Sequence, residues 1–417
     1  MENKNFTLIN ECRLCVSKDL KSLINFGSVA LGNNLLEKKE KAEQVDEFPL
    51  EVMNCQSCNH FQLSAAVNPK ILYATNYTYL SGVGQSFVKH INNYVDWVVK
   101  KTTLKESSVV VDIGSNDGTC LEAFKEKGFF VCGVDPALIP VEISKKKGIF
   151  TLLDFFSERT VKKIIKKFGT VDLVTSQNVL AHVDNLQDTF RNIFALLNNN
   201  GFLVFEVGYF KNVLEGVTFD TIYHEHLDYH QGSSLAKFLC SIGFDIVSID
   251  LNKVQGGSIR FLCKKTGKGD IYKGAKKFLL QEKKTILFNK DLLKEWPQKI
   301  FSVSKKINLI IKKEKYKGNS CYGYGCPTKA TLFLKMANLS SKDLNFIIED
   351  NLLKVGKYLP KLAIPVVGIE KLEAQKSIII IVLAWNFSDD IIRKIKKVYK
   401  FPIKIIIPLP KLRILYK

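Results

Sequence analysis

Short apolar runs alternate with helix-length segments between about residues 107 and 266. The clearest run, residues 109–113, ends in the small polar stretch Gly114-Ser115-Asn116-Asp117-Gly118. A buried strand that breaks into a glycine-containing turn before a helix is typical of a ligand-binding loop. The same pattern predicts further strands ending at residues 134, 153, 176 and 207, with helices between them, one of them capped by Ser157. This alternation indicates a doubly wound parallel sheet with ligands at the carboxyl ends of its strands.

The end of this region differs from the rest. Strands expected at residues 246–250 and 258–263 are joined by a link too short for a helical crossover, so they should form an antiparallel hairpin. Asp135 follows the second strand about twenty residues after the loop, where a carboxylate can accept the hydroxyls of a ribose. The pattern predicts a cofactor that carries a nucleoside. The loop lacks the full G-x-G-x-x-G spacing, which disfavours a nicotinamide oxidoreductase.

A second α/β region follows. Lysine-rich segments between residues 268 and 317 carry apolar residues at helical spacing and predict long amphipathic helices. Gly323 and Gly325 then open another strand–turn–helix unit, where a helix start beside Lys329 is a possible phosphate site. The fold class is therefore α/β, with a Rossmann-like core and a C-terminal Rossmann-like domain. The expected boundaries are 1–70, 71–266 and 267–417.

Four cysteines are patterned near the N-terminus. Cys12 and Cys15 form one C-x-x-C pair, and Cys55 and Cys58 form another. Four thiolates in two tight turns predict a tetrahedral structural zinc site without an open position for catalysis. Two unrelated pairs or a redox dithiol are the alternatives. We expect a small lobe of short strands with Gly27 and Gly32 in its turns.

Composition narrows the class of protein. The formal charge is +20, which suits nucleic acid, a membrane surface or a phosphorylated substrate, although solvated lysine-rich helix faces explain it most simply. No stripe of arginine and aromatic residues predicts a nucleic-acid groove. The longest apolar run, residues 378–385, is far shorter than the roughly 20 residues of a membrane span. The N-terminus resembles no signal peptide, so a cytoplasmic protein is expected.

The most polar stretch of the central region is residues 220–230, which holds three of the six histidines. It follows a strand end closely, so Tyr223, His224, Glu225 and His226 are expected at the ligand edge of the sheet, in a catalytic role. A zinc site built from His224, Glu225 and His226 is the rival, but adjacent residues rarely converge on one ion. Tyr77 and Tyr79 precede a helix expected at 84–100 and form either a wall that faces the substrate or a packed linker.

The order of these features resembles the sugar C-methyltransferases that act on nucleotide-linked 4-keto-deoxysugars, over essentially the full length. The motifs that carry the resemblance are Asp112 to Gly118, Asn178-Val179-Leu180-Ala181-His182, Tyr223-His224-Glu225-His226-Leu227, Gly256-Gly257-Ser258-Ile259-Arg260 and Leu383-Ala384-Trp385-Asn386. A departure lies in Gly325 to Ala330, where the family usually has smaller residues and a glycine after the lysine. This departure bears on the identity of the nucleotide or sugar, and less on the reaction.

The resemblance implies S-adenosylmethionine (SAM) as cofactor. It places Gly114, Ser115 and Gly118 beside the methionine part, Asp135 at the ribose, Asp154 and Phe155 at the adenine, and Asn178 near the sulfonium. The full cofactor-binding set expected is Asp112, Gly114, Ser115, Asn116, Gly118, Asp135, Asp154, Phe155 and Asn178.

Methyl transfer to carbon requires that a proton beside a carbonyl leave first, and histidine suits that step. We expect His226 to be the base, oriented by Glu225, with Tyr223 as the alternative base. Tyr223, His182 and Tyr77 would position the sugar and stabilise the enolate, and Tyr79 is the alternative to Tyr77. The residues expected to bind substrate are Tyr79, His224, Ser258, Arg260, Tyr324 and Lys329, with Arg260 and Lys329 at the diphosphate.

Two other classes of function stay open. The zinc lobe and the positive charge are compatible with an RNA or protein methyltransferase, but Gln177-Asn178-Val179-Leu180 stands where an Asn-Pro-Pro-Tyr type of motif would be expected. A non-catalytic nucleotide-binding module is the third reading. The expected partner is a nucleotide-linked keto-sugar, without nucleic acid or membrane, bound by a monomer.

Overall fold

The computed structural model describes residues 5–73, 80–372 and 378–416. The chain forms two compact units, each assembled from separate stretches. The first comprises Met1–Lys21, Met53–Phe210 and Glu225–Phe288, and the second comprises Ser22–Val52, Lys211–His224 and Asn289–Lys417. The boundaries expected from the sequence divide the chain into three continuous pieces. The two compact units are discontinuous, so they do not test these boundaries, which stay a prediction.

A seven-stranded sheet organises the first unit, in the order β12–β13–β10–β9–β6–β7–β8. Its strands are β6 (Val109–Ile113), β7 (Phe130–Asp135), β8 (Phe150–Leu153), β9 (Val171–Gln177), β10 (Leu197–Gly208), β12 (Phe244–Asn252) and β13 (Ser258–Lys265). The pairs from β10 to β8 are parallel. β13 runs antiparallel to both β10 and β12. The structure confirms the parallel sheet and the antiparallel pair at its end.

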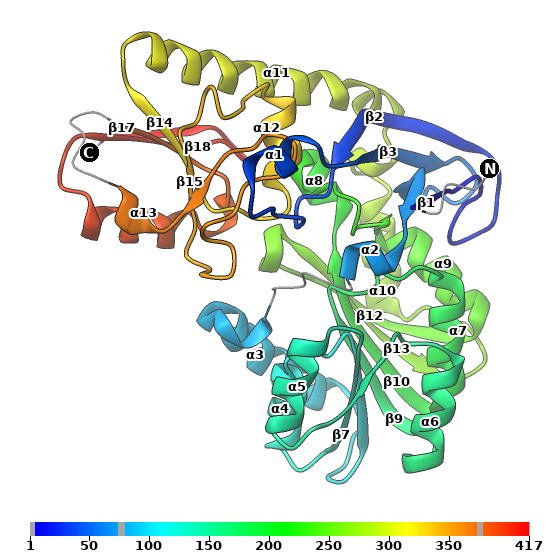
Figure 1. Ribbon diagram of the computed structural model, residues 1–417. Helices are drawn as coiled ribbons and strands as arrows, with labels where there is room; N and C mark the ends of the chain where they lie inside the picture. Colours follow the sequence, from blue (N-terminus) through cyan, green and yellow to red (C-terminus); the bar gives the residue numbers. More distant parts are fainter. Residues whose placement is uncertain (1–4, 74–79, 373–377, 417) are drawn as a thin grey trace. The chain divides into compact units, whose positions relative to one another are not determined.

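Helices cover both faces of this sheet. They are α3 (Gln85–Lys101), α4 (Thr119–Lys125), α5 (Leu138–Lys146), α6 (Glu158–Phe168), α7 (Leu186–Leu196), α9 (Gly232–Ile242) and α10 (Lys273–Glu282). The first three lie on one face, and α6, α7 and α9 lie on the other (Figure 1). Ser157 is the N-cap of α6, as expected, and its N–H donates to the Thr160 hydroxyl at 2.8 Å.

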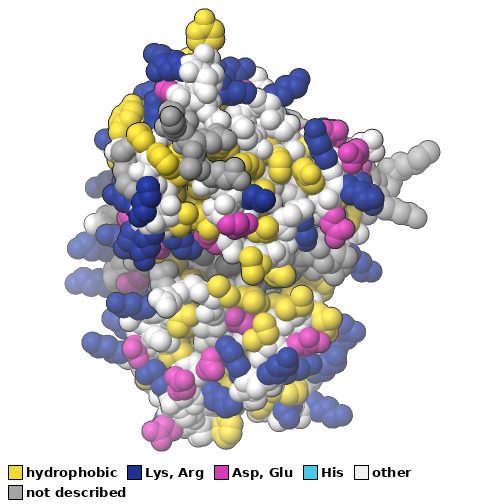
Figure 2. Space-filling model, turned by 60° about the vertical axis from the view of Figure 1, so that its left-hand side comes forward, with side chains coloured by type: hydrophobic (Ala, Val, Ile, Leu, Met, Phe, Trp, Pro, Cys, Tyr) yellow, Lys and Arg dark blue, Asp and Glu magenta, His cyan; other side chains and the backbone are white. Residues whose placement is uncertain are grey.

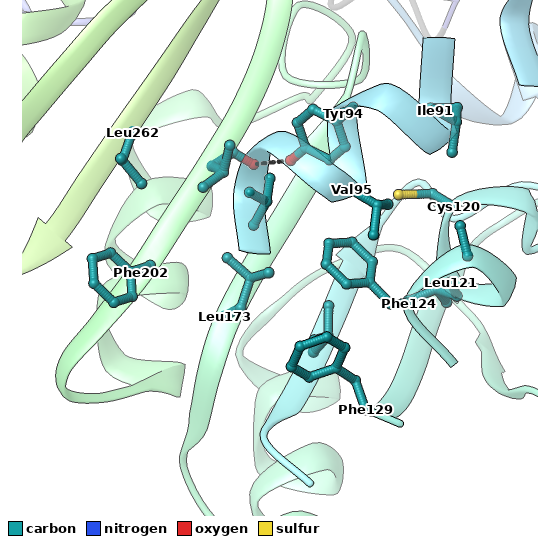
Figure 3. Close-up of a cluster of buried hydrophobic side chains, with 14 of the residues drawn as sticks. Ile91, Tyr94, Val95, Cys120, Leu121, Phe124, Phe129, Leu173, Phe202 and Leu262 are labelled. Atoms are coloured by element: carbon teal, nitrogen blue, oxygen red, sulfur yellow. Dashed lines mark hydrogen bonds between the residues drawn. The ribbon is translucent and has the colours of Figure 1, made fainter. Parts of the chain in front are cut away.

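The core of the first unit includes the helix that precedes the first strand of the sheet. Tyr94 and Val95 of α3 pack with Phe124 of α4 and Leu173 of β9 (Figure 3). The buried Tyr94 hydroxyl donates to the carbonyl of Val204 at 3.2 Å, so its polar atom is satisfied inside the core. These contacts fix the middle of α3 against the core of the first unit.

The N-terminal strands only partly follow expectation. β1 (Phe6–Leu8) pairs with β5 (Ala65–Val67), and a four-stranded sheet has the order β11–β4–β3–β2. Its strands are β2 (Leu20–Ala30), β3 (Glu47–Cys55), β4 (Phe61–Leu63) and β11 (Asp228–Tyr229), and α2 spans Pro69–Tyr73. The expectation of only short strands was wrong, because β2 has 11 residues and β3 has 9. Gly32 lies in a turn, but Gly27 lies inside β2 with φ +72°.

A six-stranded sheet organises the second unit, in the order β16–β15–β14–β17–β18–β19. Its strands are β14 (Ser320–Tyr324), β15 (Ile347–Ile348), β16 (Val366–Val367), β17 (Ile378–Val382), β18 (Ile403–Ile407) and β19 (Arg413–Tyr416). Only β19 is antiparallel to its neighbour. The expected second α/β sheet is therefore present.

The remaining helices are α1 (Lys39–Glu43), α8 (Phe210–Gly216), α11 (Lys290–Tyr316), α12 (Ala330–Met336) and α13 (Ser388–Val398). Short 3-10 turns lie at Ser81–Val83, Phe219–Thr221, Val254–Gly256, Ile286–Phe288, Ile369–Lys371 and Trp385–Phe387. α11 buries Leu293, Trp296, Ile300, Ile307 and Ile311 at the three- and four-residue spacing of one helix face. Within the described ranges, no helix is both long enough and apolar enough to cross a bilayer.

Candidate active site

The loop after β6 is shaped by residues with left-handed backbone conformations. Gly114 has φ +69°, Asn116 has +49° and Gly118 has +77°. A Cβ on Gly114 would lie 2.3 Å from a methyl carbon of Val179, so only glycine fits there. The loop therefore packs closely on the segment after β9, which brings the expected methionine site and Asn178 to the same edge of the sheet.

Two buried carboxyl groups lie under this loop. The carboxylate of Asp135 accepts hydrogen bonds from the N–H groups of Asn116 and Ala137 at 2.9 and 2.8 Å. Burial raises the pKa of Asp135, although these two hydrogen bonds oppose the rise. Burial, and then the neighbouring Asp135, raise the pKa of Asp112 well above its usual range. Among the described residues, Asp112 Oδ1 and the hydroxyl of Ser115 have no hydrogen-bond partner. Buried polar atoms without partners suit a site that a polar ligand completes.

The next two strand ends offer an apolar surface. β7 and β8 are parallel and pair Asp135 with Leu153, so their carboxyl ends coincide. Leu138 and Ile139 after β7, and Phe155 after β8, are 56%, 58% and 46% exposed. Asp154 accepts Arg159 Nη2 at 2.7 and 2.6 Å, so its carboxylate is held in place. Exposed apolar side chains here are what an adenine ring needs to stack on.

The segment after β9 carries a residue with a left-handed backbone conformation. Asn178 has φ +57°, a left-handed conformation that asparagine adopts more often than most other non-glycine residues, and its N–H donates to the carbonyl of Glu206 at 2.8 Å. The side chain is half-buried, at the position expected beside the sulfonium.

His182 and His226 come together from distant parts of the sequence. Their rings meet edge to face with centroids 4.8 Å apart. The N–H groups of Leu227 and Asp228 donate to the carbonyl of Ala181 at 2.8 and 3.3 Å, so the backbones beside both histidines are joined. Burial, and then His226, lower the pKa of His182 well below its usual range, against a hydrogen bond to the Asn178 backbone. His182 is therefore neutral at neutral pH.

The other members of the histidine-rich stretch are divided between the units. Glu225 and His226 belong to the first unit, and Tyr223 and His224 to the second. His224 is 3% exposed and donates through Nε2 to the carbonyl of Phe48 at 3.1 Å. Burial lowers its pKa to about 4. These contacts place His224 in the core of the second unit, and its role in substrate binding stays a prediction.

Tyr77 and Tyr79 lie outside the described residues. The chain that follows them is held at the cofactor loop, because Ser81 N–H donates to Asn116 Oδ1 at 2.9 Å. Gly82 N–H likewise donates to Asp117 Oδ2 at 2.8 Å. The backbone at residues 81–82 is thus fixed beside the predicted SAM site.

The four patterned cysteines converge as expected. The Sγ atoms of Cys12, Cys15, Cys55 and Cys58 all lie within 4.8 Å of one another. The separations are 3.5 Å for Cys12–Cys58 and 3.6 Å for Cys15–Cys55. A tetrahedral zinc ion with bonds of about 2.3 Å places its sulfur atoms roughly 3.8 Å apart, so the cysteines fit zinc.

Arg260 and Ser258 are engaged inside the first unit. Arg260 Nε donates to Glu206 Oε1 at 2.5 Å, and the guanidinium lies 4.6 Å from the ring centroid of Trp97. His90 Nε2 contacts the other Glu206 oxygen at 2.7 Å. Ser258 is fully buried and donates to the carbonyl of Val254 at 3.1 Å. Sequence reasoning missed Glu206, although a lone acid in the apolar run 202–207 was a signal that it needs a buried partner.

Lys329 is buried in the second unit. Its Nζ lies 3.9 Å from Asp220 Oδ2, 3.7 Å from the centroid of Trp385 and 3.1 Å from Asn386 Oδ1. Burial lowers its pKa to about 8 despite Asp220. Tyr324 is also buried and donates to Asp350 Oδ1 at 3.1 Å. α12, which starts after Lys329, has seven residues, too few for a strong helix-dipole site. Substrate binding by Lys329 and Tyr324 stays a prediction.

Three family models match successive parts of the chain. They are a zinc-binding domain at residues 12–73, a methyltransferase domain at 88–249 and a C-methyltransferase C-terminal domain at 253–410. The C-methyltransferase NovU of Streptomyces niveus is 29% identical over 408 residues, which cover 98% of this chain and 97% of NovU. The chain therefore has the domains of a SAM-dependent C-methyltransferase.

Two further proteins are similar to part of the chain. The ubiquinone biosynthesis O-methyltransferase of Histophilus somni is 29% identical over 105 residues, covering 23% of this chain and 43% of that protein. A solved magnesium protoporphyrin IX methyltransferase of Synechocystis PCC 6803 with bound SAM is 16% identical, covering 43% of this chain and 79% of that chain, with a TM-score of 0.33.

SAM and structural zinc are the cofactors of this C-methyltransferase. The residues that would hold SAM and zinc lie in the first unit. The zinc-binding model spans all four clustered cysteines, and the methyltransferase model spans the loop 114–118, Asp135 and Asn178. The assignment of individual cofactor-binding and catalytic residues stays a prediction.

Proposed function

We propose that the enzyme transfers a methyl group from SAM to the carbon beside the ketone of a nucleotide-linked keto-deoxysugar, through an enolate. The observation that carries this proposal is the edge-to-face pair of His182 and His226, 4.8 Å apart, in the unit that contains the SAM loop. Methylation at carbon needs a base that removes a C–H proton. Methylation at oxygen or nitrogen depends less on such a base.

In this mechanism His226 removes the proton beside the ketone, and Glu225 orients its ring. His182 donates a ring N–H to the Asn178 backbone, because that hydrogen bond favours its protonated form. The second nitrogen of a neutral imidazole is an acceptor, so His182 suits a sugar hydroxyl. Stabilising the enolate oxygen then falls to the hydroxyls of Tyr223 and Tyr77, each worth about 3 kcal/mol if preorganised.

When bound, SAM supplies an electrophilic methyl group. Loop 114–118 would hold its methionine part and Asp135 its ribose, while Leu138, Ile139 and Phe155 offer the apolar surface for the adenine. Asn178 fixes the edge of the site nearest His182, since its backbone N–H is hydrogen-bonded to β10.

Proton removal can be measured without methyl transfer. With S-adenosylhomocysteine and the keto-sugar in deuterated water, the wild type should exchange the proton beside the ketone. His226→Asn should slow this exchange by roughly 10²- to 10⁴-fold, because the base is removed. His182→Gln is the matched control. It should still exchange the proton, and its KM for the sugar should be higher than that of the wild type. Exchange that survives in His226→Asn would assign the base to Tyr223 or to another group.

An RNA or protein acceptor is the competing function. The basic residues do not favour it, since Figure 2 shows Lys and Arg side chains spread over the visible face among acidic ones, without one continuous stripe. RNA affinity that collapses steeply with salt would support it. The proposal also includes a cytoplasmic location, a monomeric state and no nucleic-acid or membrane partner.

A further inference from the structure

Arg13 lies between two of the cysteines that hold zinc, and its side chain is 9% exposed. Its Nε lies 3.0 Å from each carboxylate oxygen of Asp228. Its Nη1 donates to the carbonyl of Asp184 at 2.9 Å, and Nη2 to the carbonyl of Val183 at 2.5 Å. One buried guanidinium thus binds two stretches of chain that are far from it in sequence.

These two stretches carry the histidine pair. Val183 and Asp184 follow His182 directly, and Asp228 lies two residues after His226. The stretches are also joined to each other through the carbonyl of Ala181, which accepts the N–H groups of Leu227 and Asp228. Any shift of Arg13 would therefore move the backbone on which each ring is mounted.

The zinc lobe holds Arg13 and Asp228 in place. The N–H of Arg13 donates to Gln62 Oε1 at 2.8 Å, and Gln62 Nε2 donates to the carbonyl of Glu11 at 3.0 Å. His60 Nε2, two residues after Cys58, contacts Asp228 Oδ1 at 2.8 Å. β4 pairs with β11, so that Gln62 faces Asp228 across the two strands. Asp228 is thereby held from both cysteine turns of the zinc site.

We propose that Arg13 is a positioning residue that sets the separation of His182 and His226 from the zinc lobe. Its planar fork satisfies one carboxylate and two carbonyls at once. A lysine has a point charge on a flexible stem and cannot hold the same three acceptors in fixed directions. The effect of Arg13 on the methylation rate rests on the proposed function. Its effect on the separation of the two histidine rings does not.

The test compares Arg13→Lys and Arg13→Met with Gln56→Leu, full-length and zinc-loaded. Gln56 occupies the same place in the second C-x-x-C turn, and its side chain donates only to Asn54. The measurements are zinc per chain, kcat and KM for SAM, and the nuclear Overhauser effect between the rings of His182 and His226 in histidine-labelled protein. Six histidines make the assignment tractable.

Arg13→Lys should keep its zinc, weaken the ring-to-ring effect and lower kcat by roughly 10- to 100-fold, since displacements near 1 Å cost that much. KM for SAM should stay within about twofold, because the cofactor loop is not touched. Gln56→Leu should change none of these. An unchanged kcat and ring contact in zinc-loaded Arg13→Lys would overturn the proposal, and so would equal losses in Gln56→Leu.

The two proposals can fail separately. If the wild type neither exchanges nor methylates a keto-sugar while Arg13→Lys still separates the rings, the proposed function is wrong and the positioning role is supported. If the wild type exchanges the proton and Arg13→Lys leaves the rings in contact, the positioning role is wrong. Arg13→Met also removes the positive charge and so extends the test. If Arg13→Met does not fold, the result for Arg13→Lys decides whether Arg13 positions the rings.

Discussion

At the scale of single residues, the second unit contains an ammonium group that has little access to water. Lys329 is 9% exposed and Asp220 is 1% exposed. The indole N–H of Trp385 donates to Asp220 Oδ2 at 2.7 Å, so the carboxylate is held by two neighbours. Burial raises the pKa of Asp220, and Lys329 and Trp385 oppose that rise. Removing one member of such a cluster leaves the other buried with too few partners.

Lys329→Met should therefore destabilise the second unit by about 3 kcal/mol, the cost of breaking a buried pair. Lys394→Met is the control, because it breaks an exposed pair with Asp350 at 2.6 Å in the same unit. That variant should cost less than about 1 kcal/mol. Urea unfolding of both variants measures the difference. Equal shifts in the midpoint would mean that the buried cluster contributes no more than a surface ion pair.

Residue types were predictable where the backbone or the chemistry leaves few choices. The four cysteines needed only their spacing, and they converge. Arg13 and Glu206 were not predicted, because each acts through residues more than 50 positions away in sequence. A sequence pattern reports local spacing, whereas such contacts depend on how the strands are ordered in the sheet.

At the scale of elements, the stretch around His224 is bound to the second unit by a buried imidazole. Burial lowers the pKa of His224 to about 4, against the carbonyls of Phe48 and Pro49, from the ordinary value of 6.5. Between those two values the unfolded chain binds more protons than the folded one. The stability that the neutral ring contributes is therefore present above pH 6.5 and is lost as the pH falls toward 4.

This loss should reach about 3 kcal/mol at most. His224→Gln keeps a donor at the position of Nε2 but does not titrate, so its unfolding free energy should fall less between pH 7 and 4.5. Urea unfolding at both pH values measures the difference from wild type, which removes the contribution of other acidic and basic groups. An identical fall in the two proteins would show that His224 is not the group that titrates.

Elements were predictable wherever periodicity and capping agreed. The strands of the seven-stranded sheet and the Ser157 cap lie close to the expected positions. β2 was not anticipated, because a left-handed glycine normally ends a strand, yet Gly27 lies inside it. The pairing of β11 with β4 also escaped prediction, since two strands of two and three residues carry no periodicity of their own.

At the scale of the whole molecule, the chain order does not reveal the compact units. Ser22–Val52 and Lys211–His224 belong with the C-terminal residues, while Glu225–Phe288 belongs with the N-terminal cysteines. The boundary between His224 and Glu225 falls inside the histidine-rich stretch. The crossings at residues 21–22, 52–53 and 210–211 fall inside β2, β3 and α8, so a linear division of the sequence could not have found them.

The zinc site should stabilise the histidine segments as well as its own lobe. Its two cysteine turns hold Arg13 and His60, which in turn hold residues 183–184 and Asp228. Chelating zinc should therefore speed amide hydrogen exchange in peptides covering residues 180–184 and 226–232 on the order of tenfold or more, because local stability depends on these contacts. Peptides from β17 and β18 should keep their protection, and restoring zinc should restore protection in the first unit. If residues 180–184 stay protected while the cysteine turns lose protection, the metal supports only its own lobe.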